Sequence, residues 1–141
     1  MQPNLHVMKN ISLLAILLTC ATSSYSQTVL KFCIESDNQC TCKTESSQFL
    51  IGKDGGTISF LIKNEKGLGT SHVVYRIYKL DEDGKENYNS DLDQKGIKGQ
   101  WTCAWEDAVF LDPGTYVVKV YDIAGKESFI GSNTVKIFRD Y

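Results

Sequence analysis

The chain has 141 residues, five cysteines and a formal net charge of −2 at pH 7. A chain of this length favours one domain, which is large enough to bury a hydrophobic core without help. The charge is close to neutral and no basic patch stands out, so nucleic acid and anionic membrane surfaces are poor candidates for partners.

The N-terminal region, 1–26, has the pattern of a secretory signal peptide. Lys9 is followed by an apolar run at 11–18 and then by the small and polar stretch TCATSSYSQ. The apolar run is too short for a membrane span, which requires roughly 20 residues. Small residues at Ser24 and Ser26 predict cleavage before the following glutamine.

Cleavage at this point leaves residues 27–141 as a single exported domain of bacterial type. We expect it in the periplasm, at the cell surface or outside the cell. A lipoprotein signal is the alternative, because LLTC places Cys20 just after the apolar run and a lipid anchor could attach there. Thr19 stands where such signals usually have glycine, alanine or serine, which favours plain secretion.

Alternation of apolar and polar residues recurs along residues 27–141, whereas no apolar pattern of helical period is sustained over three turns. Such alternation is typical of a strand that is buried on one face. The alternating runs lie at 30–34, 58–62, 73–77, 116–120 and 135–137. The sequence therefore predicts an all-β protein.

Turn sequences punctuate these runs. KDGG, DEDGKE and IAGK carry the Gly and Asp residues that tight turns require. Because IAGK separates two strong runs, residues 116–122 and 127–138 are expected to form an antiparallel hairpin. The polar stretch 88–100 is expected to be a long loop. About seven strands with turns at this spacing predict a two-sheet antiparallel β-sandwich.

The stretch LDPGTYVVKVYD at 111–122, with the glycine turn and final strand that follow, resembles the penultimate-strand signature of immunoglobulin-like and fibronectin type III-like domains. In those folds a Pro-Gly turn leads into a tyrosine-bearing strand that crosses the core, and Tyr116 matches that tyrosine by position. The resemblance covers residues 111–138 and implies an immunoglobulin-like topology. Such domains serve as adhesin segments, enzyme accessory modules and ligand binders, so the fold indicates little about function.

Four cysteines remain after cleavage, and an even number in a small exported chain is typical of two disulfides. If residues 36–39 form a four-residue turn, Cys33 lies opposite Cys42, and Cys40 is left to bond with Cys103. The pairing of Cys33 with Cys40 and of Cys42 with Cys103 ranks a close second, because it results if the length of the turn differs by two residues. A Cys40–Cys42 bond is the least favoured pairing.

Two other functions stay open. Cys-Thr-Cys with a third cysteine upstream can bind a soft metal ion, which makes a periplasmic thiolate metal-binding protein one alternative. A small hydrolase with a carboxylate site is the other, since the chain has 17 Asp and Glu residues. We nevertheless expect no enzyme, metal or cofactor, because His72 is the only histidine after residue 26 and the sequence forces no two acids together.

Trp101 and Trp105, in the stretch WTCAW, form the most informative aromatic cluster. On a strand they share a face with Cys103, and their rings lie roughly 13 Å apart at ~3.3 Å per residue. Exposed rings at that separation form a platform for successive sugar units, whereas buried rings pack over a disulfide as core. Tyr78 and Tyr121 fall on the outward rows of their strands and can extend an aromatic surface.

The sequence thus predicts a non-catalytic exported binding or interaction module with a protein or carbohydrate ligand. A rigid sandwich would present loops or an outer sheet face to that ligand. The expected contact residues are Trp101, Trp105, Tyr78 and Tyr121.

Overall fold

The computed structural model describes residues 27–140. The expected signal peptide at 1–26 and the alternative lipid anchor at Cys20 lie outside the described residues. Within the described part every regular element is a strand, so the chain is all-β there, as the alternating pattern predicted. In the same part there is no helix with the length and apolarity needed to cross a membrane.

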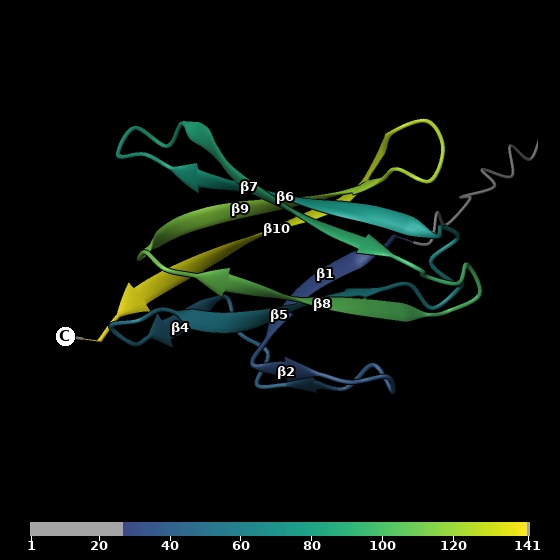
Figure 1. Ribbon diagram of the computed structural model, residues 1–141, viewed down its shortest axis with the longest axis horizontal. Coiled ribbons are helices and arrows are strands. Elements are labelled where there is room, and N and C mark those ends of the chain that lie inside the picture. The colour runs from purple at the N-terminus through teal and green to yellow at the C-terminus, as the bar shows by residue number, and fades with distance from the viewer. Residues whose placement is uncertain (1–26, 141) are drawn as a thin grey trace, which may run out of the picture.

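Ten strands are assigned between residues 27 and 140, where the sequence predicted about seven. They are β1 (Val29–Cys33), β2 (Glu35–Ser36), β3 (Cys42–Lys43), β4 (Gln48–Ile51), β5 (Gly56–Lys63), β6 (His72–Leu80), β7 (Glu86–Lys95), β8 (Cys103–Phe110), β9 (Gly114–Asp122) and β10 (Ser128–Arg139). Hydrogen bonding arranges them in a three-stranded sheet, β1-β5-β8, a five-stranded sheet, β4-β10-β9-β6-β7, and the small β2-β3 pair (Figure 1).

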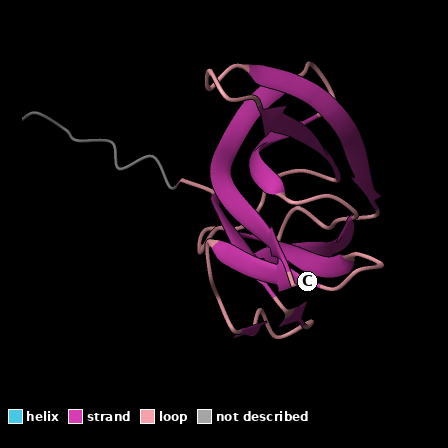
Figure 2. Ribbon diagram, turned by 90° about the vertical axis from the view of Figure 1, so that its left-hand side faces the viewer, coloured by secondary structure: helices cyan, strands magenta, loops and turns pink. Residues whose placement is uncertain are grey.

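The two larger sheets form a β-sandwich, and Figure 2 shows their strands curving around a shared interior. Alternate residues of both sheets meet there in one large hydrophobic cluster. The ring of Phe60 on β5 is fully buried and lies 5.3 Å from that of Phe32, 5.6 Å from that of Tyr75 and 6.1 Å from that of Phe110. Burial of such large side chains from both layers holds the sandwich together.

The five alternating runs lie in β1, β5, β6, β9 and β10, and the expected β9–β10 hairpin is confirmed. In β1, Leu30 and Phe32 are buried in the large cluster, as the alternation predicted, and Cys33 is buried as well, outside that cluster. Ile34, the last apolar residue of the same run, was expected to be buried with them but is 47% exposed. The reason is that β1 ends at Cys33, after which the chain turns away from the sandwich into β2.

The prediction of a long loop at 88–100 is wrong, because β7 occupies Glu86–Lys95 and pairs with β6 along its length. β7 is an edge strand, and most of its side chains are exposed. An edge strand can carry polar residues on both faces, since it is paired on one side and covers little of the core. Leu92 packs against the large cluster, but one such residue does not produce an alternating pattern.

β4 departs from the expected antiparallel arrangement. It pairs in parallel with the end of β10, so that Gln48 lies beside Lys136 and Ile51 beside Arg139. The next strand, β5, belongs to the other sheet, and a bridge between Gly52 and Gly55 closes the short connection. Consecutive strands therefore cross from one layer to the other at this point.

Tyr116 fixes the connection between β8 and β9. Its ring is buried and lies 4.9 Å from the ring of Phe110, in an edge-to-face arrangement. Its hydroxyl donates a 2.9 Å hydrogen bond to the backbone carbonyl of Asp112, four residues upstream. Burial raises the pKa of Tyr116, so this hydroxyl keeps its proton and its hydrogen bond at neutral pH.

Candidate ligand-binding site

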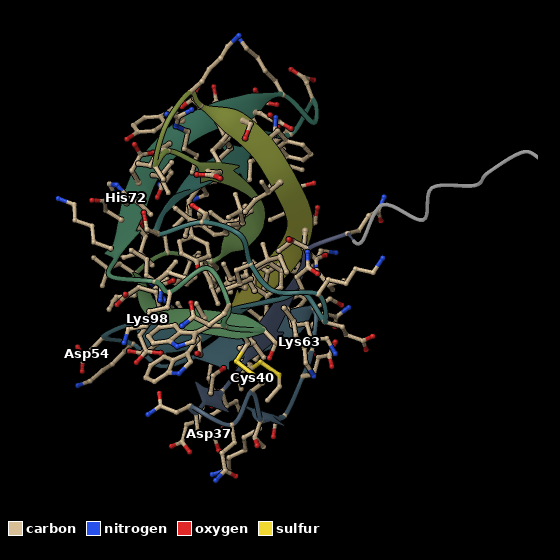
Figure 3. All side chains as sticks on the ribbon, turned by 90° about the vertical axis from the view of Figure 1, so that its right-hand side faces the viewer. Asp37, Cys40, Asp54, Lys63, His72 and Lys98 are labelled. Carbon is tan, nitrogen blue, oxygen red and sulfur yellow. A yellow bond between two sulfur atoms is a disulfide. The ribbon has the colours of Figure 1, made fainter. Side chains whose placement is uncertain are left out.

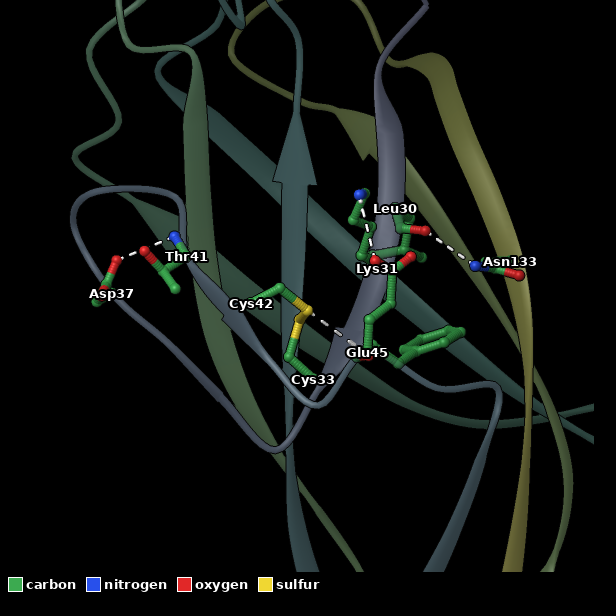
Figure 4. Close-up of a disulfide and its surroundings, with 9 residues drawn as sticks. Leu30, Lys31, Cys33, Asp37, Thr41, Cys42, Glu45 and Asn133 are labelled. Carbon is green, nitrogen blue, oxygen red and sulfur yellow. Dashed lines mark hydrogen bonds and ion pairs between the residues drawn. A yellow bond between two sulfur atoms is a disulfide. The ribbon is translucent and has the colours of Figure 1, made fainter.

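Two disulfides attach the β2–β3 hairpin to the sandwich. Cys33 is bonded to Cys42 and Cys40 to Cys103, with Cα–Cα distances of 5.4 Å and 5.8 Å, and Figure 4 shows the first of these bonds. This is the pairing ranked first from the sequence. The two bonds engage all four sulfurs, and a disulfide sulfur is not the thiolate that binds soft metal ions.

The hairpin register differs from the one that led to this pairing. Ser36, and not Cys33, lies opposite Cys42, so the turn comprises residues 37–41. Cys33 is the last residue of β1 and pairs with Ser59 of β5. The Cys33–Cys42 bond therefore connects the hairpin to the three-stranded sheet and does not bridge two opposed residues of one ladder.

Asp37 organises the turn of this hairpin. Its Oδ1 accepts hydrogen bonds from the backbone N–H of Gln39 at 2.9 Å and of Thr41 at 3.0 Å, and Figure 4 shows the second contact. The Thr41 N–H, followed by that of Gln39, lowers the pKa of the Asp37 carboxyl, although slight burial opposes this shift. Cys40 has a left-handed backbone with φ of 62°, which this turn holds in place.

A small hydrophobic cluster lies between the hairpin and the outer face of the three-stranded sheet. Its buried members are Cys33, Leu61 and Cys103, and the half-buried ring of Trp105 packs against them. Leu61 lies directly opposite Trp105 in the β5–β8 ladder, so both side chains face away from the main core. In Figure 3 the sulfurs at Cys40 lie between the sheet and the hairpin turn.

A hollow of about 640 Å³ opens to solvent beside the Cys40–Cys103 disulfide. We call it the tryptophan hollow. Its lining residues are Asn38, Cys40, Gln94, Gln100, Trp101, Thr102, Cys103, Ala104 and Trp105. They come from the hairpin turn, from β7, from the segment that leads into β8 and from the start of β8 itself, so the hollow depends on the tertiary fold. Its volume is within the ~300–1,000 Å³ that small-molecule sites span.

The two tryptophans meet in this hollow, but they are not on one regular strand. β8 begins at Cys103, and the preceding residues form a turn in which the Trp101 N–H donates to the carbonyl of Lys98. The Trp101 carbonyl accepts a 2.8 Å hydrogen bond from the N–H of Leu68. Trp101 is 43% exposed, and Trp105 is half-buried, so neither indole belongs to the main core.

Gln94 connects the two sheets at the hollow. Its Oε1 accepts a 2.7 Å hydrogen bond from the hydroxyl of Tyr75, and its Nε2 donates a 2.8 Å hydrogen bond to the carbonyl of Trp105. Burial, with a smaller contribution from the charge of Glu106, raises the pKa of Tyr75 well above its ordinary value. The Tyr75 hydroxyl therefore stays protonated at neutral pH and can donate to Gln94, which in turn donates to the backbone of Trp105. We call this pair of hydrogen bonds the clasp at Gln94.

Tyr78 and Tyr121 lie on the other side of the molecule, on the outer face of the five-stranded sheet. The ring of Tyr121 lies 4.7 Å from the guanidinium of Arg76, and the ring of Tyr78 lies 5.0 Å from the Nζ of Lys119. These cation–π contacts join neighbouring strands. The sandwich separates the two tyrosines from the tryptophans, so the four expected contact residues do not form one surface.

His72 and the turn DEDGK at 81–85 make contacts that hold the local structure in place. His72 Nε2 lies 2.7 Å from Asp93 Oδ1 at the start of β6, and Figure 3 places His72 far from Cys40. The Oδ1 of Asp81 accepts the backbone N–H groups of Asp83 and Lys85. Within residues 27–140 no three His, Cys, Asp or Glu side chains are grouped as metal ligands would be.

Sequence reasoning found Trp101 and Trp105 but missed the three carboxamides beside them, Asn38, Gln94 and Gln100. Asn38 belongs to a turn, Gln94 to a strand mistaken for a loop, and Gln100 to a second turn. Polar residues in turns are ordinary, so none carried a local signal. The disulfide between the two segments could have suggested that Asn38 and Trp101 are neighbours.

Neither a protein-family model nor a curated protein matches the chain. Among solved structures, the PmoD soluble domain from Methylocystis sp. ATCC 49242 (Rockwell) aligns with 80% of this chain and 92% of its own, at 12% identity and a TM-score of 0.47. The CARDB domain of the PF1109 protein from Pyrococcus furiosus, in complex with di-metal ions, aligns with 84% of this chain and 100% of its own, at 12% identity and a TM-score of 0.41. A beta-glucosidase from Listeria innocua aligns with 83% of this chain and 16% of its own, at 12% identity and a TM-score of 0.36. Likenesses of this degree do not bear on activity or ligand.

Proposed function

We propose that residues 27–141 form an exported, non-catalytic binding module whose contact site is the tryptophan hollow. The observation that carries this proposal is the composition of the hollow, in which two indoles and three carboxamides meet at a concave surface. Concave sites with aromatic walls and a few polar groups are the usual form of ligand sites. The ligand is a protein or a carbohydrate.

An immunoglobulin-like topology is part of the proposal. Its support is the contact of Tyr116, whose hydroxyl bonds to the carbonyl of Asp112 across the corner between β8 and β9. Immunoglobulin-like domains have such a tyrosine near the start of the penultimate strand, bonded to the backbone a few residues upstream. A rigid sandwich of this kind positions ligand-binding loops and holds them in place.

The lining of the hollow also favours binding over catalysis. Its nine described residues include no carboxylate, histidine, lysine or free thiol, so the hydroxyl of Thr102 has no general base beside it among them. Two facing acids would be needed for the carboxylate-hydrolase alternative. The residues that line the hollow supply none.

The proposal is tested by comparing Trp101→Ala with Phe129→Ala on arrays of glycans and of peptides. Both side chains are well exposed, 43% for Trp101 and 58% for Phe129, so both variants should fold normally. Phe129 packs against Tyr121 on the opposite face. We expect Trp101→Ala to lose the array signals of the unaltered protein and Phe129→Ala to keep them. Signals that survive in Trp101→Ala, or that disappear in Phe129→Ala, would contradict the site.

A further inference from the structure

The charge of the tryptophan hollow limits which ligands it can take. Its lining has two tryptophans, three carboxamides, a threonine, an alanine and one disulfide, and none of these groups ionises at neutral pH. A charged ligand would lose hydration on entering and gain no counter-charge from these residues. The lining therefore favours an uncharged ligand over an acidic or basic one.

The polar side chains of the hollow share one property, which is that each can both donate and accept hydrogen bonds. Asn38 and Gln100 are exposed, and their carboxamides make no hydrogen bond within residues 27–140. Thr102 adds a hydroxyl, and its Oγ1 makes a long contact, at 3.8 Å, with the sulfur of Cys40. Each of these three groups can donate and accept at the same time. A ligand that satisfies them must also present groups that do both.

The aromatic walls supply the apolar part of the contact. Trp101 offers an exposed indole face, and Trp105 offers a second that is half-buried. The clasp through Gln94 holds the backbone of Trp105, and the Cys40–Cys103 bond holds the facing turn. A site fixed in this way loses little freedom when a ligand binds, which favours affinity.

We propose that the tryptophan hollow binds a neutral carbohydrate chain. A sugar ring presents an apolar face to an indole, and its hydroxyls at the rim both donate and accept hydrogen bonds. The hollow is open to solvent, so a chain can run across it with one or two rings in contact. This inference rests on the proposed function and names the ligand class for the same site.

A proline-rich peptide is the competing ligand, because aromatic grooves also bind extended proline segments. Such a segment offers carbonyl acceptors but few donors, since proline has no N–H. It would leave the carboxamide oxygens of Asn38 and Gln100 without donors. The match of donors and acceptors therefore favours the carbohydrate.

The test titrates the intact exported protein with cellohexaose, xylohexaose and chitohexaose, with polygalacturonate as an acidic probe and with decaproline as the peptide probe. Tryptophan fluorescence and calorimetry report binding. We expect at least one neutral hexasaccharide to bind with little dependence on salt and to change the tryptophan emission. Trp101→Ala should weaken that binding about tenfold or more, and the double variant Asn38→Ala with Gln100→Ala should weaken it about tenfold. Phe129→Ala should leave it unchanged.

Each other outcome overturns the inference. Binding of decaproline or polygalacturonate that depends on Trp101, in the absence of neutral oligosaccharide binding, would keep the proposed site and refute the neutral carbohydrate. Oligosaccharide binding that Trp101→Ala leaves intact would place the sugar elsewhere. No binding of any probe would also count against the carbohydrate. The array comparison with Phe129→Ala then decides separately whether the hollow is the contact site.

Discussion

The molecule has two hydrophobic clusters that are held together by different means. Between the sheets, large aromatic and aliphatic side chains from both layers enclose Phe60, and this cluster contains no disulfide. Beneath the β2–β3 hairpin, the buried members are Cys33, Leu61 and Cys103, and two disulfides cross the cluster. Hydrophobic stabilisation grows with buried apolar area. The small cluster has little such area, so covalent bonds take its place.

This difference explains where the candidate site lies. The large cluster fills the space between the sheets with packed side chains, so its role is structural. The stapled hairpin lies outside the sandwich, and its turn faces Trp101 and Trp105 across the hollow. A short hairpin whose ladder has only the pairs 35–43 and 36–42 would not keep this position by hydrogen bonds alone. The disulfides therefore convert a weak element into a fixed wall.

The strongest way to break the large cluster is Phe60→Ala. Phe60 is 0% exposed and contacts three other rings, so the change leaves a cavity that close-packed neighbours cannot fill. We expect the free energy of unfolding to fall by about 3–5 kcal/mol. Urea unfolding followed by fluorescence measures this. Val109→Ala is the control, because Val109 is 67% exposed and should change the unfolding free energy by about 0.5 kcal/mol or less.

Equal losses in the two variants would contradict the assignment of the core. The hollow should survive in the fraction of Phe60→Ala that stays folded. Its walls are held by the disulfide at Cys103, which does not involve Phe60, and by the hydrogen bonds of Gln94, whose partner Tyr75 packs against the Phe60 ring.

Removal of the disulfides tests the second cluster. The Cys40–Cys103 bond closes a sequence separation of 63, so Cys40→Ala with Cys103→Ala should lower the unfolding free energy by about 4 kcal/mol on the chain-entropy model. The Cys33–Cys42 bond closes a separation of 9, for which the same model gives about 3 kcal/mol. Calorimetric unfolding of both double variants gives the comparison.

Ligand affinity separates these variants further. Loss of the Cys40–Cys103 bond removes part of the hollow's wall and frees the turn that carries Asn38. Loss of the Cys33–Cys42 bond leaves that wall bonded to β8 through Cys103. We expect affinity to fall strongly in the first variant and to persist in the second. Similar affinity in both would show that the hairpin wall does not contribute to binding.

The sequence predicted the large cluster through its alternating runs, and it ranked first the disulfide pairing that crosses the small one. Alternating apolar residues place Leu30, Phe32 and their counterparts on one face, because a strand in a sandwich has one buried side. β7 escaped this reasoning, since an edge strand needs no apolar face. The parallel pairing of β4 with β10 escaped it as well, because alternation says which face is buried and not which strand lies beside which.

The same limit applies to the candidate site. Trp101 and Trp105 were found from their own sequence, but Tyr121 was grouped with them although β9 belongs to the other sheet. An outward row on one strand can face either side of the molecule, depending on the sheet that the strand joins. Asn38 and Gln100 were invisible because only the tertiary fold and the Cys40–Cys103 bond bring their segments together.

The smallest predicted effect concerns Asp37, whose carboxylate holds the hairpin turn. Asp37→Ala removes the acceptor for the N–H groups of Gln39 and Thr41, so amide exchange in the turn should become faster. Because Asp37 is exposed, we expect the global unfolding transition to stay almost unchanged. Affinity at the hollow should fall modestly, since the turn carries Asn38 and Cys40.

The pKa of Asp37 gives this prediction a sign in pH. Its folded pKa is lowered from the ordinary value of 3.8, so the stabilisation of the turn is fully present above that value. It is lost as the pH falls below 3.8 and through the lower folded pKa. Asp37→Asn keeps an acceptor oxygen but cannot titrate, so the protection of the turn amides, taken relative to their intrinsic exchange rate at each pH, should not respond to acid in this range. The same acid response in Asp37→Asn and in the unaltered protein would show that another group controls the turn, and with it the wall of the hollow.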